Sequence, residues 1–447
     1  MPKLWPAFLA GAVCILAAAA PAAAQQEVTL SQVLDAAIKN NPGIAASQSD
    51  VAAAQAQVMQ AQAGYLPQVS GQAGYDRRWS ESSRSSSLGS ASSGSTTDGD
   101  QSSYSGSRSG QYDYYKAQLS LSQYLYDFGK TSGRVAASRS NLEASQKGLA
   151  VTLADLVRSV KNAYYEVLKK RHLVVVNQES LKVQQQHLDQ ARAFHQAGIR
   201  PKIDVTKGEV ELSKTRLQLI QARYALRTSK VDLEKLLGGP PVVGPYRLTE
   251  MPLRPPMPRE LRPLVKTALA RRPELARLKA QFMASQAQLD AAQGGYWPSL
   301  NAEGGYNWAD TDFPLDSSWQ AGLVLQWDIF TGLSTKGKVD EARAGIAKLK
   351  AQIKDQELAV NQEVSQNYLN LHEAGESIDT AALGLKQAEE NLALARGRYR
   401  TGVGNAIEFS DAEVLATEAK STLVQANYSY LQALAELERS VGGGPLP

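Results

Sequence analysis

The chain has 447 residues, which is enough for two or three ordinary domains. Its formal net charge is only +4, so the charge balance gives no indication of a nucleic-acid partner. Aromatic residues make up 7% of the chain while alanine and glutamine are frequent, a composition unlike that of a compact enzyme and closer to that of long helices.

The first 24 residues have the pattern of a secretory signal peptide. Lys3 precedes an apolar stretch from Leu4 to Ala20, and the alanines at 22–24 fit a small-residue cleavage site. We therefore expect a mature chain that begins near Gln25. An uncleaved anchor helix is the alternative.

The single cysteine, Cys14, lies in the middle of this leader after Val13, which is not the position of a lipid-modified cysteine. We therefore expect neither a lipid anchor nor a disulfide in the mature chain. No later stretch approaches the roughly 20 apolar residues of a transmembrane helix. An exported chain of this kind belongs in the periplasm, in the medium, or in the outer membrane as a β-barrel.

The sequence contains an internal duplication. Residues 42–75 align without gaps on residues 273–306, and a block that begins at Ala191 recurs from Ala395. A proline-rich stretch separates the two copies, because its prolines forbid a continuous helix. We predict a first repeat over 25–239, a linker over 240–262, a second repeat over 263–443 and a C-terminal tail over 444–447.

Each repeat shows the same predicted order of elements. A short helix that ends at a proline precedes a longer helix, which stops at the Tyr-Leu-Pro of 65–67 or the Tyr-Trp-Pro of 296–298. Two alternating segments follow, predicted as strands over about 67–79 and 112–127, and over about 298–309 and 318–329. Long helices are then predicted over about 130–197 and 334–400, each followed by a returning helix.

The predicted strands have one apolar and one polar face and are about ten residues long, which suits a membrane-crossing strand. In the first repeat the apolar row is expected to run through Leu119, Leu121 and Leu125. In the second repeat we predict a lipid-facing row with aromatic residues near its ends: Trp308, Trp319, Leu323, Leu325 and Trp327. Half-buried strands in a soluble sandwich are the alternative, although such a fold normally needs more than four.

The very polar, serine-rich segment between the first two strands, about 80–110, is predicted to be an exposed loop. Four strands cannot close a membrane barrel, because an open edge in lipid leaves backbone groups unpaired. Two copies would give eight strands and a filled interior, whereas three would give twelve strands and a channel. The polar residues of the other strand face suit a water-filled interior.

Several features occur together in a fixed order. They are the duplicated helix–hairpin–long helix unit, the helix ends at Asn41-Pro42 and Arg272-Pro273, the A-G-Y-L-P and G-G-Y-W-P breaks, and the segment D-F-G-K-T-S-G-R-V after the first hairpin. In these features the chain resembles the TolC-like outer-membrane efflux proteins over essentially its whole mature length.

This resemblance implies an α+β membrane protein: a homotrimer whose twelve-stranded β-barrel in the outer membrane of a Gram-negative bacterium continues into a long α-helical coiled-coil tunnel in the periplasm. It implies a passive exit duct for efflux or type I secretion. The implied partners are a periplasmic adaptor (membrane fusion) protein, an inner-membrane transporter and outer-membrane lipid, without nucleic acid.

The resemblance also marks candidate residues near the periplasmic tips of the helices. Tyr399, Glu408 and Asp411 match positions that form the closed entrance, and Asp204 is the equivalent acid of the first repeat. Rings of like charge in a narrow pore would attract cations. The alternative is that the acids only start their helices favourably.

Two turns are predicted to be adaptor-docking sites, or alternatively to serve chain reversal only. Their residues are Gly198, Ile199, Arg200, Gly402, Val403 and Gly404. Gly404 replaces a basic residue that often stands at this place in the family, which makes an ionic latch there doubtful. Arg200 and Lys207 are the alternative source of such a latch.

The sequence gives no enzyme signature. Four histidines are scattered without metal-ligand spacing, and His372-Glu373 begins an H-E-x-x-H motif whose second histidine is replaced by Glu376. We therefore expect no enzyme activity, cofactor or metal site. A periplasmic coiled-coil adaptor or scaffold without a barrel is the main competing class, and an exported enzyme is the other.

Overall fold

The computed structural model describes residues 26–80, 110–241 and 245–443. The predicted signal peptide with Cys14, the serine-rich loop and the C-terminal tail lie outside the described residues.

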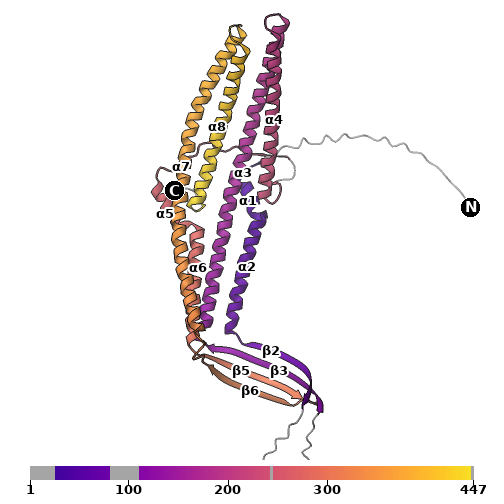
Figure 1. Ribbon diagram of the computed structural model, residues 1–447, viewed down its shortest axis with the longest axis vertical. Coiled ribbons are helices and arrows are strands. Elements are labelled where there is room, and N and C mark those ends of the chain that lie inside the picture. Colours follow the sequence, from indigo (N-terminus) through magenta and orange to yellow (C-terminus); the bar gives the residue numbers. More distant parts are fainter. Residues whose placement is uncertain (1–25, 81–109, 242–244, 444–447) are drawn as a thin grey trace, which may run out of the picture. The chain divides into compact units, whose positions relative to one another are not determined.

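The two repeats have the same order of helices and strands (Figure 1). The first contains α1 (Leu30–Asn40), α2 (Pro42–Gln62), the short helix η1 (Ala63–Tyr65), β2 (Gln68–Ser80), β3 (Gly110–Tyr126), α3 (Lys130–Gln196) and α4 (Lys202–Leu236). The second contains α5 (Leu261–Arg271), α6 (Pro273–Gln293), the short helix η2 (Gly294–Tyr296), β5 (Ser299–Asp310), β6 (Ser317–Gln326), α7 (Ser334–Arg400) and α8 (Ala406–Val441). Across the described ranges, no helix combines the length and the apolar character needed to cross a membrane.

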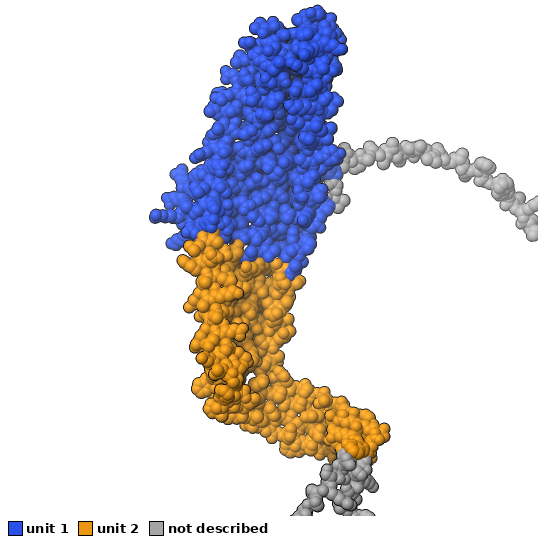
Figure 2. Space-filling view, in the orientation of Figure 1, with its two compact units in different colours: residues 1–46, 151–272, 360–447 blue, residues 47–150, 273–359 orange. Residues whose placement is uncertain are grey.

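The chain divides into two compact units, and each contains parts of both repeats (Figure 2). Unit 1 comprises residues 1–46, 151–272 and 360–447, and unit 2 comprises residues 47–150 and 273–359. The sequence repeats are therefore not themselves compact domains, because helices of one repeat pack against helices of the other.

The linker between the repeats contains structure that the sequence analysis missed. β4 (Tyr246–Leu248) pairs in parallel with β1 (Gln26–Val28). Side chains of the long helices hold the linker by its carbonyl groups: the Tyr164 hydroxyl donates to Thr249 O at 2.7 Å, and the Tyr430 hydroxyl donates to Pro255 O at 2.7 Å. Its prolines thus break the helix, while β4 and the carbonyl groups of Thr249 and Pro255 find partners in unit 1.

In both repeats the side chain of the residue before a proline donates a hydrogen bond to the end of the repeat's last helix. Asn41, which precedes Pro42, donates from Nδ2 to Leu236 O at the end of α4 with a distance of 2.7 Å. Arg272, which precedes Pro273, donates from Nε to Ser440 O at the end of α8 with a distance of 2.6 Å. Each side chain satisfies a carbonyl that the helix end leaves without an intrahelical partner.

Four strands in unit 2 form one antiparallel sheet with the order β2-β3-β5-β6. One row of paired residues is Val69–Leu121–Gly304–Ala321, and the next is Gly71–Leu119–Tyr306–Trp319. The alternate row Ser70–Ser120–Gly305–Gln320 lies on the other face, where the two serine hydroxyls are 2.7 Å apart. The sheet therefore has one apolar face and one polar face, as the period of two requires.

Leu125 does not continue the apolar row, contrary to the expectation from its spacing. β3 carries a bulge between Tyr124 and Tyr126. The extra residue reverses the alternation, so Tyr126 pairs with Leu300 and occupies the place expected for Leu125.

Trp327 is likewise not a strand residue, because β6 ends at Gln326. The last pair of the β5–β6 ladder is Ser299 with Gln326, and the preceding residue of the chain is Pro298, which has no backbone N–H to extend the ladder. The Trp327 indole instead donates to Tyr296 O at 3.2 Å. Trp308, Trp319, Leu323 and Leu325 do lie within their predicted strands.

Helices α3 and α6 approach closely at Gly133. A Cβ atom there would lie 2.8 Å from Ala287 O and 2.9 Å from the Ala291 Cβ, so only glycine permits this packing. We expect Gly133→Ala to destabilise unit 2 by about 1–3 kcal/mol through overpacking. Thermal unfolding followed by circular dichroism measures the change.

The matched control for this prediction is Gly148→Ala in the same helix. A Cβ at Gly148 meets only the flexible Arg277 Cδ at 3.9 Å, so alanine is expected to stabilise the helix by up to about 1 kcal/mol. Equal effects of the two substitutions would contradict the packing described for α3 and α6.

Candidate functional site

The predicted candidate residues of the two tip turns lie in unit 1, between α3 and α4 and between α7 and α8. Gly198 has φ +70° and Gly402 has φ +81°, a backbone conformation that favours glycine. Each turn closes its helix end with backbone hydrogen bonds: Ile199 N donates to Phe194 O at 2.9 Å and Val403 N donates to Arg398 O at 3.1 Å. Chain reversal alone therefore accounts for both glycines.

Gly404 is required by space instead. A Cβ at this position would lie 3.0 Å from the Arg398 Cβ and 3.1 Å from the Tyr399 N atom. A larger residue would crowd the end of α7, so the backbone there would have to shift by a few tenths of an ångström. The turn then passes to Asn405, whose Oδ1 accepts from Glu408 N at 2.8 Å and caps α8.

Arg200 joins the two turns within one protomer. Its Nη2 donates to Gly404 O at 2.6 Å and to Gly402 O at 3.3 Å, and its guanidinium carbon lies 5.3 Å from the centre of the Tyr399 ring. The sequence analysis named Arg200 as a possible ionic latch. Its observed partners are backbone carbonyl groups of the same chain, and no carboxylate pairs with it among the described residues.

Tyr399 lies in a small core beneath the turns. Its side chain is 1% exposed and clusters with Ala406 and Phe409. The His187 ring lies 4.9 Å from the Tyr399 ring and 4.4 Å from the Phe409 ring, measured between centroids. Tyr399 therefore contributes to packing within the protomer.

The three acidic candidates have different surroundings in the structure. Glu408 pairs with Arg398 at 3.0 Å, an exposed contact worth about 0.2–1 kcal/mol. Asp204 stands in the first turn of α4, where a carboxylate favours the helix dipole. Asp411 is exposed and lines a cavity. The structure thus leaves Asp411 as the candidate acid that is outside both a first helical turn and an ion pair.

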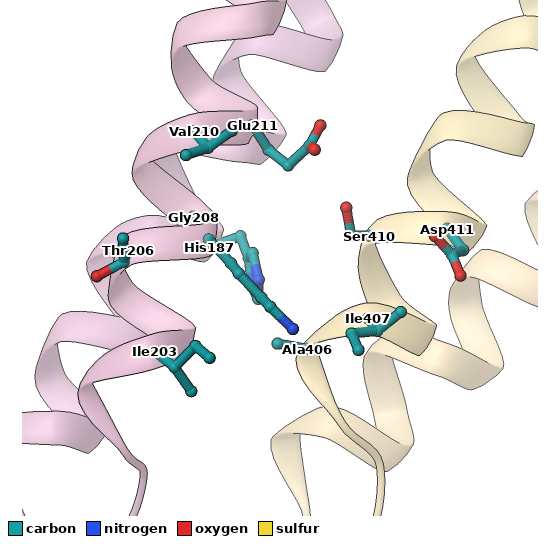
Figure 3. Close-up of a pocket in the computed structure, with 11 residues that line it drawn as sticks. His187, Ile203, Thr206, Gly208, Val210, Glu211, Ala406, Ile407, Ser410 and Asp411 are labelled. Carbon is teal, nitrogen blue, oxygen red and sulfur yellow. The ribbon is translucent and has the colours of Figure 1, made fainter.

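This cavity has a volume of about 540 Å³ and lies between the α3–α4 hairpin and α8 (Figure 3). Ile203 and Val210 of α4 and Ile407 of α8 are its apolar lining residues from these two helices, and His187 of α3 reaches into the space between α4 and α8. Its polar lining residues are Thr206, Lys207, Glu211, Ser410 and Asp411. Within the described ranges, no cluster of histidine, cysteine and acidic residues can hold a metal ion.

A buried polar seam, Ser180, Gln184 and His187 of α3 with Glu413 of α8, was missed by the sequence analysis. Ser180 Oγ donates to Glu413 Oε1 at 3.4 Å, whereas Glu413 Oε2 and His187 Nδ1 have no hydrogen-bond partner in the described part of the chain. The sequence contains a pattern that could have predicted the seam. Ser180, Gln184 and His187 are four and three positions apart, which places polar residues on one face of the helix where apolar residues are expected.

Burial shifts the acid–base properties of this seam. Desolvation raises the pKa of the Glu413 carboxyl, opposed by the hydrogen bond from Ser180, by Lys420, by Thr417 and by Arg396. Desolvation lowers the pKa of His187, opposed by the Asp204 carboxylate. Burial thus shifts the acid–base equilibrium of each group toward its uncharged form, relative to the same group in water.

Loss of Arg200 should loosen the tip. We expect Arg200→Ala to remove two hydrogen bonds from a charged donor and so to cost about 1–2 kcal/mol. Amide hydrogen exchange of residues 398–406 should become about 5–30-fold faster. The control is Lys202→Ala, an exposed cation at the start of α4. Unchanged exchange in Arg200→Ala would show that the contact does not hold the turns together.

The seam predicts a pH dependence with opposite signs for its two groups. Because the folded pKa of His187 is lowered, the unfolded chain takes up the proton more readily, and stability falls as the pH drops below the ordinary value of 6.5. Because the folded pKa of Glu413 is raised, its stability contribution is present below the ordinary value of 4.5 and is lost as the pH rises through the folded pKa.

We therefore expect hydrogen-exchange protection of α3 around residue 187 to decrease between pH 7 and pH 5, after correction for the intrinsic exchange rate. His187→Gln should flatten this decrease, and Glu413→Gln should raise protection at neutral pH. His372→Gln, outside the seam, is the control. A wild-type profile that His187→Gln leaves unaltered would rule out this residue as the source.

The chain is similar in sequence to known outer-membrane proteins. A family model described as "Outer membrane efflux protein" matches residues 33–239 and 264–443. The chain is 25% identical to Protein CyaE of Bordetella pertussis over 441 residues, covering 96% of this chain and 88% of that protein. It is 26% identical to the pyoverdine export outer membrane protein OpmQ of Pseudomonas aeruginosa over 430 residues, covering 93% of this chain and 85% of OpmQ.

The fold is similar to that of solved structures. CusC, a protein described in terms of transmembrane channel formation, matches with a TM-score of 0.79 at 18% identity, covering 94% of this chain and 93% of that chain. An identity this low supports similarity of fold alone. The residue roles at the tip therefore depend on the geometry of this chain.

Proposed function

Because the chain belongs to the outer membrane efflux protein family, whose members are outer-membrane channels, we propose that three copies build one exit duct. In this duct a twelve-stranded β-barrel crosses the outer membrane and continues into an α-helical tunnel in the periplasm. Proteins of this family are channels and not enzymes.

The observation that carries the proposal is the four-stranded sheet with two free edges. Among the described strands, β2 pairs only with β3 and β6 pairs only with β5. The apolar face is exposed at Trp319, Leu323 and Leu325. In lipid each unpaired backbone group costs several kcal/mol, so β6 of one copy must pair with β2 of the next. Three copies give twelve strands, a number large enough for a water-filled interior lined by the polar face.

The helices of unit 1 support the same closure. Polar contacts place them in the order α4–α3–α8–α7: Arg192 of α3 pairs with Glu209 of α4, Arg439 of α8 pairs with Asp155 of α3, and Lys420 of α8 approaches Glu389 of α7. The outer helices α4 and α7 each retain one side without a neighbour in this order.

Both outer helices carry an exposed apolar stripe. On α4 the stripe repeats every seven residues: Ile203, Val210, Leu217, Tyr224 and Val231. On α7 it consists of Leu369, Leu383 and Leu394, whose spacings of 14 and 11 return to the same helix face. Each stripe lies on the side of its helix opposite the buried side. The buried side of α4 contains Leu212 and Leu219, and the buried side of α7 contains Leu371 and Ile378. Packing of α4 on α7 of the next copy would cover both stripes and generate a closed ring.

The tip is the proposed contact region for a periplasmic adaptor that links the duct to an inner-membrane transporter. Ile199 and Val403 are exposed at the two turns, which Arg200 holds side by side. Three Asp411 side chains, one from each copy, would supply a ring of negative charge near the entrance. OpmQ is named as a pyoverdine export protein, and we assign this chain the general role of passive efflux or secretion.

Paired cysteines test the ring. Leu217 follows Gly198 by 19 residues and Leu383 precedes Gly402 by 19 residues, so the two side chains lie at equal distances from the tips. In a Cys14→Ser background we expect Leu217→Cys with Leu383→Cys to give cross-linked dimers and trimers after oxidation, and nothing larger. The purified protein should conduct ions across a planar bilayer.

Each single cysteine variant is the control, because a heterologous contact joins one site of each kind. A cross-linked series that stops at the dimer, or continues beyond the trimer, would contradict the three-fold ring. A trimer that never conducts would contradict the duct.

A further inference from the structure

The turn between β6 and α7, residues 327–333, presents apolar side chains that the described chain does not cover; we call it the β6–α7 turn. Ile329 and Phe330 are 81% and 83% exposed, and Leu333 is exposed as well. Three large apolar side chains within five residues of one turn indicate an interaction surface.

Hydrogen bonds fix the backbone at the end of the β6–α7 turn, from Thr331 into the start of α7. Ser334 N donates to Thr331 O at 3.3 Å, Thr335 N donates to Thr331 Oγ1 at 3.4 Å, and Gly337 N donates to Leu333 O at 2.9 Å. Leu333 itself has φ +68°, a conformation that non-glycine residues rarely adopt. The chain therefore enters α7 through an ordered backbone, and Leu333 adopts its conformation at an energetic cost.

The equivalent turn of the first repeat does not share this exposure. It contains only residues 127–129, and Phe128 stacks on Trp297 with ring centroids 5.6 Å apart. Lys130 beside it donates from Nζ to Trp297 O at 3.0 Å. In the first repeat the aromatic and basic side chains thus find partners within the chain, whereas those of Phe330, Lys336 and Lys338 in the second repeat have no ring contact, hydrogen bond or ion pair with any described residue.

Two cations follow the β6–α7 turn. Lys336 and Lys338 are exposed and form no ion pair within the described residues. The first turn of α7 contains no acidic residue. Positive charge at the start of a helix opposes the helix dipole, so an anionic partner outside the protomer would relieve an unfavourable arrangement.

The β6–α7 turn also continues the apolar face of the sheet. The last apolar row, Tyr126–Leu300–Leu325, lies at this end, and Trp297 and Trp327 are exposed beside it. Aromatic residues at the end of an apolar strand face mark the boundary between lipid and water in membrane barrels. Charge and continuity therefore favour a phospholipid layer over a protein as the partner.

We propose that the β6–α7 turn inserts Ile329 and Phe330 into the phospholipid layer where the sheet meets the helices, with Lys336 and Lys338 against the anionic headgroups. This inference rests on the proposed barrel, because the sheet must cross the membrane for the turn to reach its surface. The turn would fix the depth of the barrel in the membrane, since it combines apolar insertion with electrostatic attraction.

Site-directed spin labelling tests the insertion. In a Cys14→Ser background the variants Phe330→Cys, Leu323→Cys and Lys354→Cys each carry one nitroxide label on the full-length protein, reconstituted in vesicles of phosphatidylethanolamine and phosphatidylglycerol. Leu323 reports the apolar face of the sheet, and Lys354 is an exposed position on α7. Collision rates with oxygen, which partitions into lipid, and with a water-soluble nickel chelate are compared for each label.

Labels at Phe330 and Leu323 should collide more with oxygen than with nickel, and the label at Lys354 should show the reverse. More nickel than oxygen collision at Phe330 would place the turn in water and overturn the inference. Weak collision with both would place it against a neighbouring copy, which also overturns it. Nickel-accessible Leu323 would instead refute the proposed barrel, so the two failures are distinguishable.

The headgroup contact has a separate measurement. Lys336→Glu with Lys338→Glu should lower the ratio of oxygen to nickel collision at Phe330 by about twofold in the anionic vesicles, and by less in vesicles of phosphatidylcholine alone. Equal ratios for the variant and the wild-type lysines in anionic vesicles would remove these lysines from the proposal and leave apolar insertion by itself.

Discussion

Backbone hydrogen bonding is the constraint on which the architecture depends. Every strand of the sheet has its N–H and C=O groups paired on one side by its neighbour, but β2 and β6 each leave one side open. An apolar face alone could be covered by detergent, lipid or another protein. A row of unpaired peptide groups beside that face can be satisfied in lipid only by another strand. The open edges of the sheet are therefore the observation on which the proposed assembly of several copies depends.

The long helices also carry apolar surface that lacks a partner within the described chain, but its sequence period differs from that of the strands. Strands repeat every two residues, whereas the stripe on α4 repeats every seven. A long helix with one buried side and one exposed apolar side gains little stability alone, because most helical stability in proteins comes from packing. The proposed ring of copies would thus pair the free edges of the sheet and cover the exposed stripes of the helices at the same time.

Within the protomer, carbonyl groups at chain breaks are repeatedly satisfied by side chains distant in sequence. Asn41 and Arg272 contact the last turns of α4 and α8, and Arg200 contacts the turn between α7 and α8. The seam between α3 and α8 follows the opposite principle, since Glu413 and His187 are buried with incomplete hydrogen bonding. A fully apolar contact would hold these helices more firmly, so the seam marks a place where the tip is easier to open.

The period of each segment could be read from neighbouring residues alone. Apolar alternation gave the strands, proline positions gave the helix ends at 41 and 272, and the duplication gave the order of elements; the family predicted from these features is confirmed. Only the tertiary structure decided the register and the partners. The bulge before Tyr126, the location of Trp327 outside β6 and the burial of Tyr399 each depend on atoms contributed by segments far away in the chain. Periodicity is a local property that neighbouring residues fix, whereas pairing, desolvation and hydrogen bonding arise only when distant segments meet, and for that reason the tip acids could be located in the sequence but their partners could not.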